Sequence, residues 1–521
     1  MIEGLSMFME ALVGFFKPMT IFNVLWATQL GIIVGMLPGL TATMGIALLT
    51  TLTFKMAASD AVLILICMYV GAIYGGSRSA ILLNIPGTPA NAATALDGHP
   101  LARSGNAGRA IGIGTTGSFL GSIIGLFCLA IFTPIIGNFA LNFQSFEFFT
   151  LAIFGVVICG NLTAPKDPLK GWISGFLGLF VAMIGMEGIH AYVRFSFGSV
   201  DLAGGIDLIP AMVGVFGFSE IISVMKNEKL EVIKTEITRV IPRFKEVILH
   251  WKTIIRSGII GVFIGAIPGV GEDIAAWVSY DFAKNASKEP EKYGKGSYEG
   301  LISAETGNNA ACGGTIIPVL SLAIPGSAPA AVLLAAMFIH NVRPGPLIML
   351  ENPEFVFQTV AMVLLATIGM FILGLSMVRW LVKVLEVPRE KLMPIVFVLC
   401  VIGAYAIHSR RFEISVMVVF GLIGFIMKEM DYPVAPMVLG IILGDILDKN
   451  LRRAMVISEG NIFMLFTRPI SLVIFLLTVL TIVSKMRWFR GTWVAVKSAV
   501  IGVITEKKMK EKIEEKRKDT D

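Results

Sequence analysis

Long apolar segments recur along most of the chain, and they are not interrupted by a regular polar position. Examples lie at residues 111–136, 355–375, 392–407 and 470–483. An α-helix rises about 1.5 Å per residue, so an apolar segment of about 20 residues can cross the apolar core of a bilayer. A membrane β-barrel would instead show short segments of alternating hydrophobicity. The pattern therefore predicts an all-α polytopic membrane protein with about a dozen transmembrane helices.

The overall composition supports this class. The chain has 521 residues, of which 55% are hydrophobic and 15% are charged, whereas a soluble protein has about 25% charged residues. The net charge of +6 is concentrated in residues 226–252 and in the tail 485–521. Because basic residues near the ends of spans mark the cytoplasmic side, we expect both segments to be cytoplasmic. The tail is typical of a solvated charged helix, and no nucleic-acid partner is expected.

The organisation of the chain follows from these segments. The first residues are apolar but contain Glu3 and Glu10 instead of a basic stretch, which favours an interfacial amphipathic helix over a cleavable signal peptide. The predicted units are the N-terminal interfacial helix 1–20, a first membrane repeat 21–225, a charged cytoplasmic linker 226–252, a second membrane repeat 253–450, a C-terminal span 451–484 and a basic cytoplasmic tail 485–521.

Internal similarity is the basis for the two repeats. GMLPGLTATMG at 35–45 resembles GAIPGVGEDIA at 265–275, which lies 230 positions later. YGGSRSAILLNIPGTPANAA at 74–93 resembles CGGTIIPVLSLAIPGSAPAA at 312–331. Each half therefore contains two Pro-Gly pairs within apolar segments. The sequence predicts a duplicated fold, and we expect the repeats to be inverted.

A Pro-Gly pair inside an apolar segment predicts a broken helix. Proline removes a backbone N–H and glycine permits conformations outside the helix. Broken backbone is tolerated in a bilayer where it faces protein or a polar cavity. Paired, interrupted helices in two matching halves are typical of secondary transporters, in which helix N-termini bind anions and unwound carbonyls bind cations. One such break is usually a packing kink, but four paired breaks favour a binding site.

Small hydroxyl and amide residues accompany the breaks and define two candidate sites. The predicted substrate-binding residues are Ser77, Asn84, Pro86, Gly87, Thr88, Asn308, Asn309, Gly326 and Ser327. The predicted ion-binding residues are Gly39, Thr41, Thr43, Gly269, Gly271, Glu272 and Asp273. Neutral donors suit a carboxylate, and carbonyl-type oxygens suit Na⁺. The assignment of the two sets to the two ligands is interchangeable.

Five ionisable residues have alternative interpretations. Asp97 precedes a glycine, which favours an Asp-Gly turn at a loop entry. Glu272 and Asp273 either stabilise a helix N-terminus or take part in cation coordination or proton coupling. Glu305 is an intramembrane acid and is by default a candidate functional residue. Arg78 either pairs with a substrate carboxylate or extends to the membrane surface.

Other kinds of chemistry have little support in the sequence. The five cysteines lie in apolar segments and are expected to be free thiols, and the five histidines show no metal-binding spacing. We therefore expect no transition metal and no cofactor other than a coupling cation, Na⁺ or H⁺. The chain also lacks a recognisable nucleophile–base pair. It is expected not to be an enzyme, with a membrane-embedded enzyme as the weaker alternative and an ion or anion channel as the other one.

The same motifs resemble the large membrane subunit of tripartite tricarboxylate transporters (TctA-type). The resemblance rests on GMLPGL, YGGSRSAILLNIPGTPANAATALDGHPLA, GAIPGVGEDIAAWVSYDFAK and YGKGSYEGLISAETGNNAACGGTIIPVLSLAIPG, and it covers nearly the whole chain. It implies cation-driven symport of tri- or dicarboxylates across the cytoplasmic (inner) membrane. It also implies a small membrane subunit, an extracytoplasmic solute-binding protein and, by analogy with related carriers, an elevator-like mechanism. A homodimer is one assembly that this interpretation allows.

The chain departs from the family pattern at Glu272 and Asp273, where small residues are frequent. If these acids faced the substrate, each would repel a carboxylate at about 4 Å by on the order of 4 kcal/mol at an effective dielectric constant near 20. The departure favours mono- or dicarboxylates over citrate, or acids that serve the cation.

Overall fold

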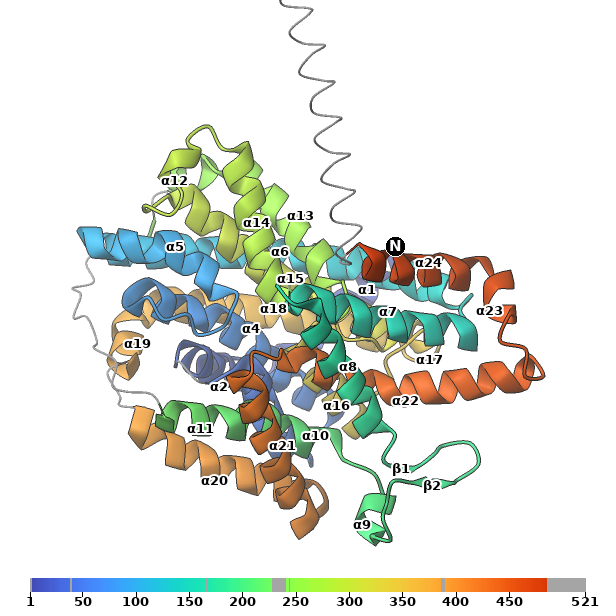
Figure 1. Cartoon of the computed structure of the whole chain (residues 1–521). Helices are drawn as coiled ribbons and strands as arrows, with labels where there is room; N and C mark the ends of the chain where they lie inside the picture. Colours follow the sequence, from blue (N-terminus) through green and yellow to red (C-terminus); the bar gives the residue numbers. More distant parts are fainter. Residues whose placement is uncertain are drawn as a thin grey trace, which may run out of the picture.

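A computed structural model describes residues 2–37, 40–164, 166–226, 240–242, 244–385 and 389–484. Several predicted features lie outside these residues. They are the first Pro-Gly pair, Pro38 and Gly39, most of the linker 226–252 and the tail 485–521. The described chain forms helices almost throughout (Figure 1).

The first half of the chain contains eleven α-helices, two π-helical turns and one strand pair among its described residues. Its elements are α1 (Ile2–Phe15), α2 (Pro18–Met36), α3 (Ala42–Thr53), α4 (Ala58–Leu83), α5 (Asn91–Leu101), η1 (Ala102–Asn106), α6 (Ala107–Ala140), α7 (Ser145–Thr163), α8 (Pro168–Ala182), β1 (Gly185–Met186), β2 (Val193–Arg194), α9 (Val200–Ala203), α10 (Leu208–Met212), η2 (Val213–Phe218) and α11 (Ser219–Lys226).

The described residues of the second half form no strand. Its elements are α12 (Phe244–Ile248), α13 (Trp251–Gly265), α14 (Gly271–Ala286), the 3₁₀ turn η3 (Pro290–Lys292), α15 (Tyr298–Leu322), α16 (Ala328–Ile339), α17 (Ile348–Glu351), α18 (Pro353–Ser376), α19 (Val378–Leu385), α20 (Arg389–His408), α21 (Arg411–Glu429), α22 (Val434–Ile457), α23 (Met464–Thr467) and α24 (Pro469–Val483).

Five helical segments of the described chain are long and apolar enough to cross a membrane. They are Pro18–Met36, Ala58–Leu83, Asn91–Ala140, Ser145–Thr163 and Pro353–Ser376. The apolar segments 111–136 and 355–375 fall within two of them, and 392–407 and 470–483 fall within α20 and α24. Shorter apolar helices add to these. The chain is a multi-pass, all-α membrane protein, and the number of crossings stays a prediction.

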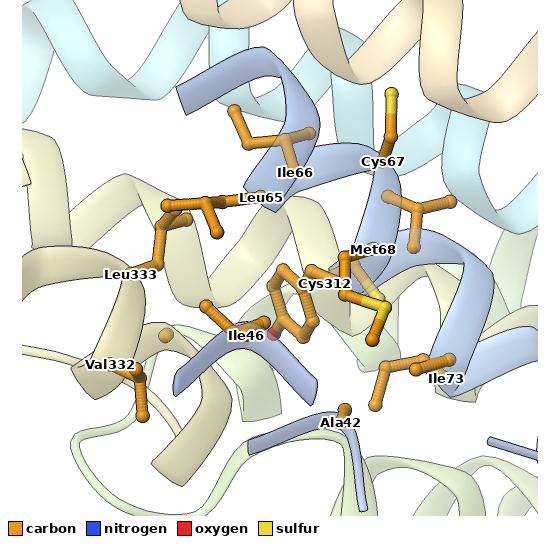
Figure 2. Close-up of a cluster of buried hydrophobic side chains, with 14 of the residues drawn as sticks. Ala42, Ile46, Leu65, Ile66, Cys67, Met68, Ile73, Cys312, Val332 and Leu333 are labelled. Carbon is orange, nitrogen blue, oxygen red and sulfur yellow. The ribbon is translucent and has the colours of Figure 1, made fainter. Parts of the chain in front are cut away.

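Helices α4 and α15 form the centre of the molecule. Every residue from Ala61 to Leu82 in α4 is buried, and so is every residue from Gly300 to Ser321 in α15. These two stretches have equal lengths and lie 239 positions apart. Figure 2 shows part of the core, where side chains of α3, α4 and α16 meet Cys312 of α15.

The helix pairs α2–α4 and α13–α15 have the same kind of contact. A Cβ atom on Gly35 would lie 1.9 Å from the carbonyl oxygen of Ala72, and one on Gly265 would lie 2.7 Å from that of Ala311. Gly35 and Gly265 are 230 positions apart, and Ala72 and Ala311 are 239 apart. Small residues allow membrane helices to approach closely in this way. Each pair is therefore held by backbone-to-backbone packing that a larger side chain would disrupt.

A loop that contains β1, β2 and α9 extends away from the helices at the end of α8 (Figure 1). The buried carboxylate of Glu187 anchors it. This carboxylate accepts hydrogen bonds from the backbone of Ile189 and His190 and pairs with Arg452 of α22 at 3.2 Å. Burial alone raises the pKa of Glu187, but these hydrogen bonds and the charge of Arg452 outweigh it and hold the pKa below its ordinary value. The loop is thus tied to α22 by an ionised carboxylate.

Candidate functional site

Four helix breaks define the candidate site. The first separates α2 from α3, and the second separates α4 from α5. The third separates α13 from α14, and the fourth separates α15 from α16. Each break lies at one of the four Pro-Gly pairs. The helix that precedes each break ends within a buried part of the protein.

The second and fourth breaks begin with the same helix C-terminus. Asn84 ends α4 with a left-handed φ of 56°, and Ala323 ends α15 with a φ of 57°. The next residue in each break donates its N–H back into the helix. Ile85 donates to Ser79 at 3.3 Å, and Ile324 donates to Pro318 at 3.2 Å. Asn84 is exposed, and its observed role is that of a C-cap.

The glycines of these two breaks also occupy equivalent positions. A Cβ on Gly87 would lie 2.1 Å from the carbonyl oxygen of Gly35, and a Cβ on Gly326 would lie 2.2 Å from that of Gly265. The helix residues Gly35 and Gly265 directly precede the first and third breaks. The C-terminal end of α2 therefore lies against the second break, and the C-terminal end of α13 lies against the fourth.

Hydrogen bonds join the breaks to one another, both between the two halves of the chain and within the second half. The N–H of Ala90, at the start of α5, donates to Asp273 at 3.3 Å. The N–H of Gly269 donates to the carbonyl of Pro325 at 3.3 Å. Gly269 and Gly271 have φ values of 73° and 58°, a conformation that favours glycine. The structure therefore brings the second, third and fourth breaks together.

Glu272 occupies the centre of this junction. Its side chain is 3% exposed, and its Oε1 accepts hydrogen bonds from Tyr69 of α4 and, at 3.1 Å, from Ser327 of the fourth break. Tyr69 also lies 2.7 Å from the hydroxyl of Thr315. Among the described residues, Glu272 has no salt bridge to a basic side chain. A buried carboxylate requires a counter-charge or a proton, so this position suits a mobile cation.

The carboxylates of Glu272 and Asp273 form hydrogen bonds to other elements of the structure. Both lie in the first turn of α14, where the helix dipole favours acids. Their hydrogen bonds nevertheless reach Tyr69, Ser327 and Ala90 on other elements. The two carboxylates therefore link α14 to other elements, in addition to their favourable interaction with the dipole of α14.

The amide residues of α5 and α15 have unused hydrogen-bonding capacity. Asn308 is fully buried, and neither its Oδ1 nor its Nδ2 has a partner among the described residues. Asn309 donates to the carbonyl of Glu305 at 3.0 Å, while its Oδ1 lacks a partner. Asn91 accepts a hydrogen bond from Thr88 at 2.7 Å, and its Nδ2 lacks a partner. Unpaired buried amides are costly, which makes them suitable for a polar ligand.

The remaining predicted residues have mainly structural contacts. Ser77 donates to the carbonyl of Tyr74 at 2.7 Å, and Thr41 caps α3 by accepting the N–H of Met44 at 3.2 Å. Thr43 is buried, and Pro86 is exposed. Gly39 lies outside the described residues.

A second polar group surrounds Glu305 on α15. This carboxylate accepts hydrogen bonds from Thr94 of α5 at 2.5 Å and from Ser118 of α6 at 2.6 Å. Arg78 is 2% exposed and donates to Tyr74 and to the carbonyl of Gly374 at 2.6 Å, while its Nε and Nη1 lack partners among the described residues. Arg78 is thus buried and does not extend to the membrane surface.

The assignment of Asp97 to an Asp-Gly turn was wrong. Asp97 lies inside α5 and is fully buried. Its Oδ1 accepts the N–H groups of three residues in the loop before α15, and its Oδ2 accepts the hydroxyl of Tyr280 at 2.9 Å. The three backbone donors are Gly294, Gly296 and Ser297, at 2.8, 2.9 and 2.8 Å. Asp97 therefore fixes a loop of the second half to a helix of the first.

Sequence reasoning missed Tyr69 entirely. This residue lies in an apolar stretch of α4, and nothing local distinguishes it from a core aromatic residue. Only the approach of Glu272, far away in the sequence, gives its hydroxyl a partner. A small cavity of about 10 Å³ next to Gly269 and Ser327 has room for one water-sized species.

Comparison with known protein families matches one family to most of the chain. The model of the tripartite tricarboxylate transporter TctA family matches residues 21–439. An Agrobacterium vitis protein described as "Uncharacterized 52.8 kDa protein in TAR-I ttuC' 3'region" is 34% identical over 471 residues, which cover 88% of this chain and 92% of that protein. Another from the same organism, "Uncharacterized protein in TAR-II ttuC' 3'region", is 33% identical over 211 residues, or 40% of this chain and 87% of that protein. No solved structure matches the chain.

Proposed function

Since the chain belongs to the tripartite tricarboxylate transporter TctA family, we propose that it is the membrane permease for uptake of a tri- or dicarboxylate, driven by a cation gradient. Its proposed partners are a small membrane subunit and an extracytoplasmic solute-binding protein. Its proposed location is the cytoplasmic (inner) membrane. The family is one of transporters, which agrees with the expectation that the chain is not an enzyme.

The environment of Glu272 is the main observation that supports coupling to a cation. Glu272 is a buried carboxylate without a basic partner in the described chain, it follows the third helix break, and it accepts a hydrogen bond from Ser327 of the fourth. Transporters use such breaks to bind ions and anions at mid-membrane. In this proposal, Na⁺ or H⁺ neutralises Glu272, and the hydroxyls of Tyr69 and Ser327 keep the carboxylate in place.

The substrate is proposed to use the unpaired amides. Asn308 has both side-chain polar atoms free of partners in the described chain, so its Nδ2 is available to donate to a carboxylate. Asn91 supplies a further unpaired Nδ2 on α5. Arg78 has two unpaired nitrogens and is the candidate for pairing with a substrate charge. Neutral donors plus one guanidinium favour an anion with few charges.

The duplicated contacts support two structural repeats. The glycine contacts of Gly35 and Gly87 in one half recur at Gly265 and Gly326 in the other. We propose that the tightly packed pairs α2–α4 and α13–α15 belong to one rigid transport unit, consistent with an elevator-like mechanism. The orientation of the repeats is proposed to be inverted.

Uptake by the purified protein in vesicles tests the proposed function. Labelled citrate and a panel of dicarboxylates are supplied with and without a Na⁺ or H⁺ gradient and with and without the solute-binding protein. The expected result is saturable uptake that requires both the gradient and the binding protein. Flux that does not saturate with substrate concentration and does not depend on either gradient would refute the carrier hypothesis and favour a channel.

A further inference from the structure

Three potential metal ligands meet outside the candidate transport site. Asp207 precedes α10, His408 ends α20, and Glu413 lies in the first turn of α21. Figure 1 shows α10, α20 and α21 on the same side of the molecule. The turn that joins α20 to α21 contains Ser409 with a φ of 55°, which reverses the chain and places His408 and Glu413 near each other.

The distances between the potential ligand atoms suit one metal ion. Nδ1 of His408 lies 3.1 Å from Oδ2 of Asp207 and 3.5 Å from Oε1 of Glu413. The three atoms lie within 4.8 Å of one another. Ligands bonded at 2.0–2.2 Å in a tetrahedral site are separated by about 3.3 Å. Small side-chain adjustments would thus bring all three atoms to one ion.

The surrounding charges favour a cation. Two carboxylates face one imidazole nitrogen, and one guanidinium lies near them. Arg410 donates to Oε1 of Glu413 at 2.5 Å and lies 4.0 Å from Asp201. With a neutral His408, the two carboxylates exceed the one basic charge, and Asp201 offsets that charge further. Hydrogen bonds to a ligating carboxylate are a usual feature of the surroundings of metal sites.

Two further observations point to a ligand. Glu413 is fully buried, and its Oε2 has no hydrogen-bond partner among the described residues. An unpaired buried carboxylate oxygen is costly. Beside the cluster, an open surface pocket of about 640 Å³ is lined by His408, Asp207, Arg410, loop residues 204–206 and Leu208 of α10. This pocket provides access for an ion and space for a water ligand.

We propose that Asp207, His408 and Glu413 bind one divalent transition-metal ion, with Zn²⁺ as the favoured ion. One imidazole and two carboxylates form a mixed nitrogen and oxygen ligand set that suits Zn²⁺ better than Ca²⁺, which takes oxygen ligands. The ion would link the start of α10 to the turn between α20 and α21. The histidine spacing in the sequence contains no sign of this site, because Asp207 and His408 lie far apart along the chain.

Metal titration of the full chain in detergent tests the proposal. The chelator-treated protein is titrated with Co²⁺ alone and followed by visible absorption, and Zn²⁺ is then added as a competitor. We expect one Co²⁺ per chain and displacement by Zn²⁺. His408→Ala and Asp207→Asn should each weaken binding at least tenfold. Asn retains the N-cap on α10 that Asp207 provides through its other oxygen, so Asp207→Asn should fold normally.

His190 provides a matched control. It lies 3.1 Å from the carboxylate of Glu187 and is 52% exposed, but no third potential ligand accompanies this pair in the described chain. His190→Ala should therefore bind Co²⁺ like the wild type. Absence of saturable binding by the wild type, or equal binding by well-folded His408→Ala, would overturn the proposal. In that case the cluster is a metal-free set of polar contacts.

Discussion

Glu272→Gln is the sharpest test of cation coupling. The substitution removes the negative charge while it preserves the size of the side chain and an oxygen that accepts hydrogen bonds from Tyr69 and Ser327. Because Glu272 is 3% exposed, solvent cannot replace the lost interaction. The variant should fold, since removal of a buried charge without a basic partner leaves no unpaired ion behind.

The expected effect can be derived from the two hydrogen bonds. A bond to a charged group contributes roughly 1 kcal/mol more than a bond between neutral groups. The two hydroxyl groups hold the carboxylate in place for the cation. Replacing the carboxylate with an amide therefore weakens these two hydrogen bonds by about 2 kcal/mol in total. Since about 1.4 kcal/mol is a factor of ten, this corresponds to roughly a 30-fold weaker response to the cation. Direct contact between the cation and the carboxylate would increase the effect.

The assay measures initial rates of carboxylate uptake in vesicles against Na⁺ concentration, and against pH in the absence of Na⁺. In Glu272→Gln the concentration of Na⁺ that gives half of the maximal rate should rise at least about 30-fold, and coupling to H⁺ should be lost, because the amide of glutamine takes up no proton. Asp281→Asn is the control, because Asp281 lies on the same helix but is exposed and accepts a hydrogen bond from Asn285 at 3.2 Å. Cation dependence that stays at the wild-type value in Glu272→Gln would refute the role of this carboxylate.

Three further predictions concern packing, substrate binding and pH. Gly35→Ala should lower the free energy of unfolding by about 1–3 kcal/mol, because its Cβ would overlap the carbonyl of Ala72, whereas Gly14→Ala has open space; equal thermal melts for the two variants would contradict this. Asn308→Ala should weaken uptake at least tenfold, about 1.4 kcal/mol, and normal uptake by the folded variant would remove Asn308 from the site. The pKa of Glu187 is depressed, so its ionised carboxylate stabilises the loop 184–207 at neutral pH. This stabilisation is lost as pH falls through the ordinary glutamate range of about 4 to 5 and below, where the carboxylate becomes protonated. Protease cleavage of the loop should therefore increase in acid, whereas Glu187→Gln should be cleaved at neutral pH and lose this pH dependence.

The sequence predicts the positions of the helix breaks because their cause is local. Proline and glycine act on the backbone where they occur, so the ends of α4 and α15 follow from Pro86-Gly87 and Pro325-Gly326. The all-α membrane class likewise follows from apolar segment length. The internal sequence similarity also aligns Gly35 with Gly265, and these two glycines have similar close contacts in the structure.

The partners of the polar side chains could not be predicted in this way. Tyr69 meets Glu272, and Asp97 meets the loop that contains Gly294, only because distant helices pack together. Asp97-Gly98 has the local pattern of a turn, but α5 continues through it, and three backbone donors from the other half stabilise the buried carboxylate. The tertiary contacts thus overrode the local preference.

The contacts of the acids also bear on how the proposed carrier moves. Asp97, Asp273 and Glu305 each bind groups from the other half of the chain, through Gly294, Ala90 and Thr94. Separation of α5 from α14 and α15 would leave three carboxylates without these partners, at a cost of about 1–3 kcal/mol for each of the two buried ones, Asp97 and Glu305, whereas Asp273 is exposed. Rocking of one half against the other is therefore opposed by the same contacts that assemble the site. Movement of both sets of broken helices together as one body preserves these bonds, which is the physical argument for the elevator-like mechanism proposed here.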